Sequence, residues 1–446
     1  MPYLLDAFYL LGLLVLSPWL LYKALTTGKY RSGIVQKVFG RVTQVAPKSP
    51  HHLTTSPLQH RIWFHGVSVG EIHLLRQVVA RYRQRHPDHL CVISTTTDTG
   101  YAEACNHFAG MAVIYWPFDF SWAVRRALRT VRPSLVVLAE GELWPNFLFA
   151  AKQQGVPVAV INGRLSPRSE RNYRRLGPFA RIVVRCPSVI AAQTEEYAAG
   201  YRALGAENVV VTGNVKYDGV EGDRDNLKTR ELRHLLSIAD SDLVWIAGST
   251  QASEEAIALD IFRRIQPDHP NVRLIIVPRQ NDRFEEVASL LRDSGVPYLR
   301  RSELHRTSHS VVPSPGHAVI LVDTIGELSA LWGLADVAFV GGSLDGRRGG
   351  QNMIEPAAYG AAVVFGPHVW NFKETAARLV EAGAAIQVTD AVTLENAVHH
   401  LLSDEDERRD MGSAAREFVR RQQGATEKTL AVLEQLLVPG TLAKAG

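Results

Sequence analysis

Short apolar runs separated by segments with helical periodicity make up most of this 446-residue chain. In the first half, runs that predict buried strands lie at 62–65, 91–94, 112–115, 135–139, 158–161, 189–192 and 209–211. Between them lie segments such as 72–85 and 122–129, whose apolar residues recur every three or four positions and predict helices. This regular alternation predicts a parallel sheet covered by helices on both faces.

The alternation stops at a polar, charge-dense stretch (217–229) and then resumes, with strands predicted at 243–247, 273–277, 318–322, 337–340 and 362–365. Two similar halves joined near residue 220 predict an α/β protein with two doubly wound, Rossmann-like domains that face each other across a cleft. We expect these domains over 26–220 and 221–425, followed by a C-terminal helix and tail over 426–446. Ligands of such sheets bind beyond the carboxyl ends of the strands.

The N-terminal segment is different in kind, because residues 3–22 are almost all apolar, with Asp6 and Pro18 as interruptions. Twenty helical residues match the hydrocarbon thickness of a bilayer, about 30 Å. No basic residue precedes this segment, and the basic residues Lys23, Lys29, Arg31, Lys37 and Arg41 follow it. The pattern predicts a single-pass anchor over 1–25 with the remaining chain in the cytoplasm. The alternatives are a helix buried in the protein or one lying at the membrane interface, and the early Asp6 favours these.

Composition narrows the class of protein only slightly. Hydrophobic residues make up 46% and charged residues 21% of the chain, as in globular proteins, and the net charge is +4. The three cysteines are widely spaced, which fits a reducing compartment, and no cysteine or histidine cluster has metal-ligand spacing. Arginines crowd the segment 164–185 and form either a surface for phosphate or anionic lipid or a solvated helix face.

Several common catalytic motifs are absent from the sequence. It contains no GxxxxGK[ST] loop, no GxGxxG with a following ribose-binding acid, no GxSxG and no HExxH. These absences exclude most kinases, dehydrogenases, serine hydrolases and zinc proteases.

Charged residues follow several predicted strands of the first half. In HGVSVGE, Glu71 begins a helix, whose dipole favours the ionised carboxylate and suits a general base. Glu140 and Glu142 follow the strand at 135–139. Glu140 could hold a substrate hydroxyl or position a basic partner, whereas Glu142 could serve a site or equally begin a helix. In TGNVKYD, Lys216 lies near the domain junction and could neutralise charge on a leaving phosphate. The plainer interpretations are helix-start stabilisation for Glu71 and a surface lysine for Lys216.

The stretch 340–372 of the second half has the pattern of a nucleotide-sugar pocket. An apolar strand leads into a glycine-rich turn, and a helix begins around Asn352 with Glu355 in its first turn. Free N–H groups at a helix start attract phosphate, and a carboxylate one turn later could accept ribose hydroxyls. Pro278–Arg279 and Gly326–Leu328 likewise follow predicted strands and could contact a base or phosphate. Ordinary tight connections of an α/β sheet are the alternative.

Eight motifs in order identify a family resemblance: HGVSVGE, AEGELWPNF, INGRLSPRS, TGNVKYD, VPRQNDRF, DTIGELSALWGLADVAFVGGS, GGQNMIEPAA and GPHVWNF. Together they resemble the 3-deoxy-D-manno-octulosonic acid (Kdo) transferases of lipopolysaccharide assembly, from the apolar N-terminus to about residue 420. The resemblance implies the GT-B fold, a membrane-anchored enzyme at the inner membrane and an inverting transfer of Kdo from CMP-Kdo to the 6′-hydroxyl of a lipid A precursor.

The resemblance also implies roles for particular residues. Glu71 would be the base, and Glu140 and Lys216 would stabilise the transition state. Domain 26–220 would bind the acceptor and domain 221–425 the nucleotide. The donor would be held by Pro278, Arg279, Gly326, Glu327, Leu328, Asn352, Met353, Ile354 and Glu355. No metal, no cofactor and no nucleic-acid partner is implied.

The chain departs from the family pattern at three places. Gln351 replaces a histidine of the usual GGHNPLE, which removes a titratable ring but keeps hydrogen bonding. The segment 30–42 lacks the family's Gly-Glu-Arg trio, and VPRQNDRF differs from the commoner PRHPERF. Two competing functions are another GT-B transferase or sugar-nucleotide epimerase using a UDP-sugar, and a catalytically silent, membrane-tethered binding protein.

Overall fold

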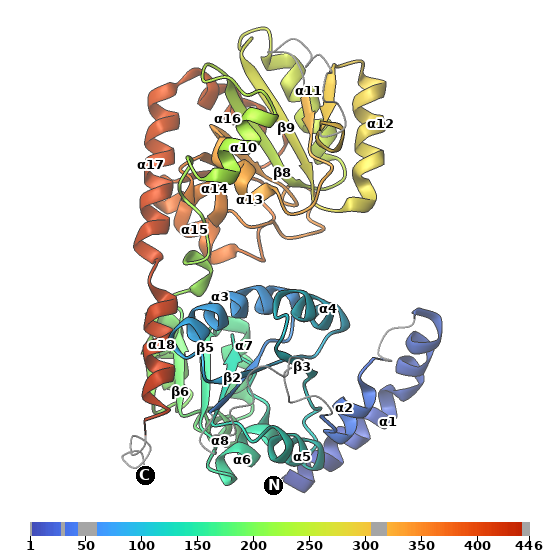
Figure 1. Cartoon of the computed structure of the whole chain (residues 1–446), viewed down its shortest axis with the longest axis vertical. Coiled ribbons are helices and arrows are strands. Elements are labelled where there is room, and N and C mark those ends of the chain that lie inside the picture. The colour runs from blue at the N-terminus through green and yellow to red at the C-terminus, as the bar shows by residue number, and fades with distance from the viewer. Residues whose placement is uncertain (1, 28–31, 43–59, 305–318, 439–446) are drawn as a thin grey trace. The chain divides into compact units, whose positions relative to one another are not determined.

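The computed structural model of the chain describes residues 2–27, 32–42, 60–304 and 319–438. The chain divides into two compact units, Met1–Gly219 with Gln423–Gly446 (unit 1) and Val220–Gln422 (unit 2), each built around a seven-stranded sheet (Figure 1). Every strand pair in both sheets is parallel among the described residues. The predicted α/β, doubly wound fold is confirmed. Lys29 and Arg31, two of the basic residues that follow the predicted anchor, lie outside the described residues, as do residues 43–59.

The sheet of unit 1 has the strand order β3-β2-β1-β4-β5-β6-β7. Its strands are β1 (Arg61–His65), β2 (Leu90–Thr95), β3 (Ala112–Tyr115), β4 (Leu135–Ala139), β5 (Val158–Gly163), β6 (Val189–Ala192) and β7 (Val209–Val211). Because successive side chains alternate between faces, Trp63 of β1 packs into one core, whereas Ile62 and Phe64 pack into the other. All seven predicted strands are confirmed.

Helices on both faces cover this sheet. They are α3 (Val69–Arg85), α4 (Asp98–His107), α5 (Ser121–Val131), α6 (Pro145–Gln153), α7 (Pro167–Arg175), α8 (Pro178–Val184), α9 (Glu195–Ala203) and the C-terminal α18 (Ala425–Gln435). The N–H groups of Gly424 and Thr426 both donate to the carboxylate of Asp218, which holds the start of α18 to unit 1.

The sheet of unit 2 has the order β10-β11-β9-β8-β12-β13-β14. Its strands are β8 (Leu243–Thr250), β9 (Val272–Pro278), β10 (Tyr298–Arg300), β11 (Val319–Leu321), β12 (Val337–Val340), β13 (Ala362–Phe365) and β14 (Ala385–Gln387). The five predicted strands are confirmed. The two edge strands β10 and β14 were not predicted, since each has only three residues and no continuous apolar run.

The α-helices of unit 2 are α10 (Leu227–Leu235), α11 (Glu254–Ile265), α12 (Phe284–Ser294), α13 (Leu328–Leu331), α14 (Ile354–Ala358), α15 (Lys373–Glu381), α16 (Ala391–Ser403) and α17 (Glu405–Gln422). Two of them, α13 and α14, are only about one turn long and lie at the carboxyl edge of the sheet.

In both sheets the order of the strands reverses beside the first strand of the unit. This reversal lies between β1 and β4 in unit 1 and between β8 and β12 in unit 2. Connections leave the two strands of each pair in opposite directions, so a crevice opens at their carboxyl ends, where ligands of doubly wound sheets bind. We call these two reversals the switch points of the sheets, and functional groups are expected beside them.

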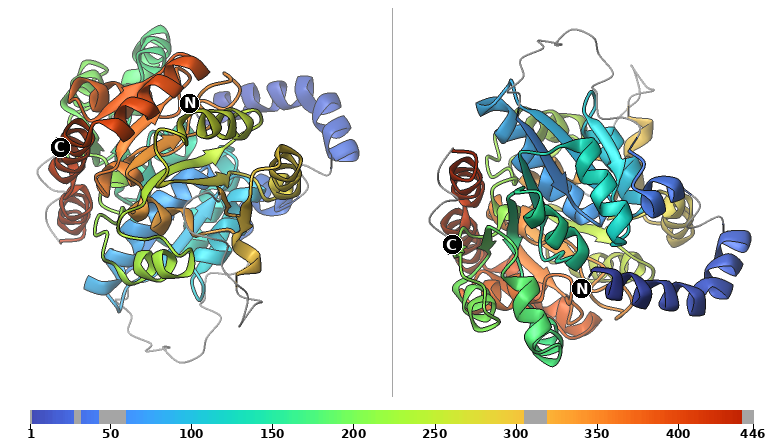
Figure 2. Two further views of the ribbon diagram at one scale, coloured as in Figure 1. Left: turned by 90° about the horizontal axis from the view of Figure 1, so that it is seen from above. Right: turned by 90° about the horizontal axis from the view of Figure 1, so that it is seen from below.

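The N-terminal segment forms α1 (Pro2–Thr27), which contains an 18-residue window, Pro2–Trp19, long and apolar enough to cross a membrane. The helix begins beside α5 and extends away from the sheet of unit 1 (Figures 1 and 2). It is followed by the short α2 (Ile34–Phe39). Lys37 of α2 is not a free cation next to the helix, because it is buried over the Tyr115 ring and lies 3.7 Å from Asp98.

Candidate active site

Glu71 lies in the first turn of α3, directly after β1 and beside the switch point of unit 1. Its carboxylate accepts the Val67 N–H at 2.7 Å and the Ser68 hydroxyl at 3.0 Å, which fixes the orientation of the half-buried side chain. The helix dipole favours the ionised form, but burial outweighs it and raises the pKa of Glu71. A carboxylate with a raised pKa holds an abstracted proton more firmly, as a general base requires.

Glu140 and Lys216 form an ion pair at the same edge of the sheet. Glu140 follows β4 with a left-handed φ of 63°, a conformation that costs a non-glycine residue about 1–3 kcal/mol and is common at functional sites. Its carboxylate accepts the Lys216 ammonium at 3.0 Å. Lys216 belongs to the short 3-10 helix η2 (Val215–Tyr217), whose Val215 N–H donates to buried Asn162 at 3.0 Å. Asn162, from the motif INGRLSPRS, thus positions the loop that carries Lys216.

Glu142 is a third acid of this site, and the sequence analysis did not choose between a site role and a helix-start role for it. It lies in the loop before α6, which begins at Pro145, so it is not a helix-start residue. Burial and the negative charges of Glu71 and Glu140 raise the pKa of Glu142 to about 7. Three carboxylates and one ammonium therefore interact electrostatically at the switch point of unit 1.

His65, which opens the motif HGVSVGE, has a structural role. Its ring is fully buried, stacks on Trp116 with centroids 3.8 Å apart, and has Nδ1 3.0 Å from the Ser94 hydroxyl oxygen. Burial lowers the pKa of His65 to about 3, so the ring is neutral near pH 7.

The glycine-rich loop after β12 in unit 2 is already occupied by a carboxylate of the protein. Buried Glu254 accepts the Gln251 and Gly342 N–H groups at 2.9 and 2.7 Å, and the Ser343 and Leu344 N–H groups at 2.9 and 3.1 Å. The N–H groups of residues 342–344 are therefore not free to bind a phosphate, and the expected phosphate contact at the helix start near Asn352 stays a prediction. Glu254 gave no signal in the sequence, because three of its four partners lie about ninety positions away.

Residues after β9 and before α14 meet beside this loop. The Arg279 guanidinium donates to the Gln351 side-chain oxygen at 3.3 Å, and the Asn352 amide donates to Glu355 at 2.9 Å. Burial raises the pKa of Glu355, while the positive charge of Arg279 opposes that shift. Arg279 is exposed and available to an anion.

The other predicted donor-binding residues are less accessible. Pro278, Met353 and Ile354 are buried, so any contact with a nucleotide would come from their backbone. Gly326 has a left-handed φ of 89°, and Leu328 begins the four-residue helix α13. The carboxylate of Glu327 between them already accepts hydrogen bonds from Arg301, at 2.7 Å, and from the Thr324 hydroxyl.

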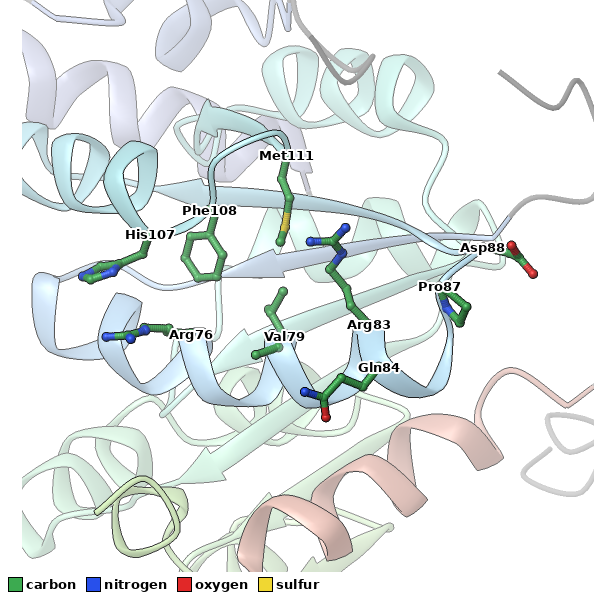
Figure 3. Close-up of a pocket in the computed structure, with 10 residues that line it drawn as sticks. Arg76, Val79, Arg83, Gln84, Pro87, Asp88, His107, Phe108 and Met111 are labelled. Carbon is green, nitrogen blue, oxygen red and sulfur yellow. The ribbon is translucent and has the colours of Figure 1, made fainter. Parts of the chain in front are cut away.

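A cavity of about 660 Å³ between α3 and α4 lies apart from these groups (Figure 3). Arg76 and Arg83 of α3 line it together with His107 and Phe108, and it contains none of the predicted site residues. At one end His107 and His73 lie 2.8 and 3.2 Å from the same oxygen of Glu103. This cluster was invisible in the sequence because His73 comes from a different helix.

The arginine-rich segment 164–185 is partly neutralised by local acids. On α7, Arg174 pairs with Glu170 at 2.6 Å, and after α8, Arg185 pairs with Glu207 at 3.2 Å. The structure gives α7 no buried side chain, so it is a solvated helix. A role in binding phosphate or lipid stays a prediction.

A solved structure with the same architecture identifies the fold. The chain resembles MurG of Acinetobacter baumannii with a TM-score of 0.53, over 84% of this chain and 99% of that one, at 14% identity. At this identity the likeness concerns the fold alone. Two doubly wound domains of this type form the GT-B fold.

Sequence relatives narrow the class to one family. A family model described as 3-deoxy-D-manno-octulosonic-acid transferase (kdotransferase) matches residues 33–219. The 3-deoxy-D-manno-octulosonic acid transferase of Bordetella pertussis is 35% identical over 444 residues, covering 96% of this chain and 99% of the relative. That of Haemophilus influenzae is 34% identical over 386 residues, covering 85% and 88%. The chain belongs to the Kdo transferase family, which confirms the resemblance seen in its eight motifs.

Replacing Glu254 by Gln should destabilise unit 2 by about 3 kcal/mol, because an amide would present N–H groups to two of the four buried N–H donors. Hydrogen exchange of residues 220–422, followed by mass spectrometry on the full chain, measures this loss. The exposed Glu231→Gln on α10 is the matched control and should change stability by less than about 0.5 kcal/mol. Equal protection from hydrogen exchange in the two variants would show that the four hydrogen bonds to Glu254 contribute little to the stability of unit 2.

Replacing Glu142 by Gln should flatten the pH dependence of stability. Because the pKa of Glu142 is about 7 in the folded protein and 4.5 ordinarily, the folded state binds more protons between these values. The free energy of unfolding should therefore fall as pH rises from about 5 to about 8, with at most about 3 kcal/mol due to Glu142. Urea unfolding across this range should show a smaller decline for Glu142→Gln. The exposed Glu196→Gln should keep the original slope, and an unchanged slope in both variants contradicts the assignment.

Proposed function

We propose that this chain is an inverting glycosyltransferase that moves Kdo from CMP-Kdo to the 6′-hydroxyl of a lipid A precursor of the lipid IVA type, in lipopolysaccharide assembly. The observation that carries the proposal is the oriented, half-buried Glu71 carboxylate at the switch point of unit 1 in a chain of the Kdo transferase family. Its raised pKa suits removal of a proton from a hydroxyl.

The reaction is a single displacement at the anomeric carbon of Kdo. The acceptor hydroxyl gives its proton to Glu71 while its oxygen forms the new glycosidic bond. The bond from the anomeric carbon to the CMP phosphate breaks, and the phosphate takes the electron pair. Attack from the face opposite the leaving group inverts the configuration. Lys216, paired with Glu140, supplies positive charge near the reacting groups, and Glu140 keeps that ammonium oriented.

Unit 2 binds CMP in this proposal. Arg279 faces the phosphate, and the Glu355 oxygen that Asn352 does not use accepts ribose hydroxyls. The backbone at Pro278, at Gly326–Leu328 and at Met353–Ile354 completes the donor site. Gln351, in place of the family histidine, binds Arg279 through its side-chain oxygen and so helps to orient the guanidinium.

A lipid acceptor requires the enzyme to work at a membrane. We place the chain at the inner membrane, attached through α1 with both units on the cytoplasmic side, because α1 is apolar and basic residues follow it in the sequence. A UDP-sugar donor is supported only by likeness of fold, at 14% identity, to structures such as the UDP-GlcNAc 2-epimerase from Neisseria meningitidis bound to UDP-GlcNAc. A likeness of fold carries no information about the nucleobase of the donor.

The purified chain, incubated with CMP-Kdo and a lipid A precursor, should increase the mass of the lipid by one or more Kdo residues. Glu71→Ala should lower the rate of transfer by about 10²–10⁴-fold, because the general base is lost, while CMP-Kdo affinity stays unchanged. Mass spectrometry measures the rate at which the lipid product forms, and calorimetry measures the affinity for CMP-Kdo. The exposed Glu196→Ala in unit 1 should keep full activity. Absence of product with the unaltered chain would refute the function, and near-normal transfer by Glu71→Ala would refute the base.

Arg279→Ala should weaken CMP binding by about 10–100-fold, the effect of losing a charge-assisted hydrogen bond of about 1.5–3 kcal/mol. The exposed Arg292→Ala on α12 is the matched control and should bind CMP as the unaltered chain does. Titration calorimetry measures both, and competition should be seen with CMP but not with UDP. Equal affinities for the two arginine variants would remove Arg279 from the donor site.

A further inference from the structure

Helices α3 and α4 pack against each other on one face of the sheet of unit 1 (Figure 1). Fully buried Ala104 of α4 belongs to the same apolar cluster as Leu75 and Val79 of α3. Three partly exposed polar side chains meet at the edge of this contact, His73 from α3 and Glu103 and His107 from α4. We call these three residues the His-Glu-His cluster.

The polar atoms of the His-Glu-His cluster lie close together. The Nε2 atoms of His107 and His73 lie 2.8 and 3.2 Å from the same carboxylate oxygen of Glu103. One possible ligand atom from each side chain lies within 4.8 Å of the other two. The two imidazole rings have centroids 5.2 Å apart and planes inclined at 62°, so they approach the carboxylate from different directions.

These separations suit a tetrahedral metal ion. Zn²⁺ binds imidazole nitrogen at about 2.0–2.1 Å and carboxylate oxygen at about 2.0–2.2 Å, so two ligand atoms of a tetrahedral site lie about 3.3 Å apart. The two nitrogen–oxygen distances, 2.8 and 3.2 Å, are close to this value. Two imidazoles with one carboxylate form a set of protein ligands that zinc uses, with a fourth position left for water.

The cluster combines ligands from two helices. Glu103 and His107 are four positions apart on α4 and therefore lie on one face of that helix. His73 reaches the same point from α3, so an ion held by all three would crosslink the helices. The side chains of His73, Glu103 and His107 are 49%, 28% and 24% exposed. This exposure leaves one side open for entry of the ion and for a water molecule as its fourth ligand.

The charge and chemistry of the cluster favour a transition-metal cation. With both imidazoles in the neutral form that binds metals, the cluster carries a single negative charge. Arg76 lies three positions after His73 and lines the same cavity as His107 (Figure 3). It is exposed, so solvent and salt screen its repulsion of a bound ion. Imidazole ligands suit zinc and its neighbours, whereas Mg²⁺ and Ca²⁺ prefer oxygen.

We propose that His73, Glu103 and His107 bind a divalent transition-metal ion of the Zn²⁺ type, which crosslinks α3 to α4 at the surface of unit 1. Water completes the coordination on the exposed side. The role of the ion is structural, and none of its three ligands is assigned to Kdo transfer. The inference therefore goes beyond the proposed function and does not depend on it.

Zinc titration in competition with a chromophoric chelator tests the site. The purified full chain, first stripped of metal, should bind Zn²⁺ through the cluster. His107→Ala should weaken this binding by at least about 10–100-fold, because even the loss of a group that only supports a metal ligand has an effect of this size. Circular dichroism of the metal-free variant checks that it folds.

The matched control is His400→Ala in unit 2. His400 forms a second group with Asp404 and Glu407 whose possible ligand atoms also lie within 4.8 Å of one another, but this group offers a single imidazole and is exposed throughout. His400→Ala should keep the zinc affinity of the unaltered chain. Equal affinity in the unaltered chain and His107→Ala, or a loss in His400→Ala alone, would overturn the proposed site.

Hydrogen exchange of the full chain, measured with and without Zn²⁺, tests the crosslink. At a free Zn²⁺ concentration about 100 times the dissociation constant, exchange that requires separation of α3 from α4 should slow by about 100-fold. We expect this within Val69–Arg85 and Asp98–His107 of the unaltered chain and not in His73→Ala, which removes the ligand from α3. Zinc that leaves exchange of both helices unchanged, or that slows it equally in His73→Ala, would refute the crosslink.

Discussion

The reversal of strand order beside the first strand of each sheet is the constraint on which the functional groups of this protein depend. Connections from β1 and β4 leave in opposite directions, as do those from β8 and β12, so no helix closes the carboxyl edge between them. Polar side chains can gather there without being buried under a covering layer. Glu71 and Glu140 follow the first strand pair, and the glycine-rich loop and its carboxylate follow the second.

The two switch points differ in charge, as the two proposed roles, proton abstraction in unit 1 and donor binding in unit 2, would require. In unit 1 three carboxylates share one ammonium, and burial and mutual repulsion raise the proton affinity of Glu71 and Glu142. In unit 2 the internal anion Glu254 uses the N–H groups that a phosphate would otherwise take. In the proposed donor site, recognition of the phosphate therefore rests on the exposed Arg279. The glycines of this loop serve a close approach to the protein's own carboxylate, as Gly341 shows: a Cβ at this position would stand 2.7 Å from Glu254.

Local patterns in the sequence predicted the strands and the division into two halves, because buried parallel strands are continuous apolar runs. They also selected Glu71, Glu140 and Lys216, since each follows such a run. They could not predict that Glu140 and Lys216 pair, that Glu254 binds a distant loop, or that Lys37 is buried, because these contacts depend on tertiary packing. The three-residue edge strands β10 and β14 lacked a pattern for the same reason: their pairing with β11 and β13 creates them.

The motif AEGELWPNF connects two parts of unit 1 that the sequence alone keeps apart. At one end Glu140 binds Lys216, and at the other Asn146 binds Asp6 of α1. A displacement of α1 at Asp6 would therefore be transmitted along this single short loop to the ion pair that orients the Lys216 ammonium.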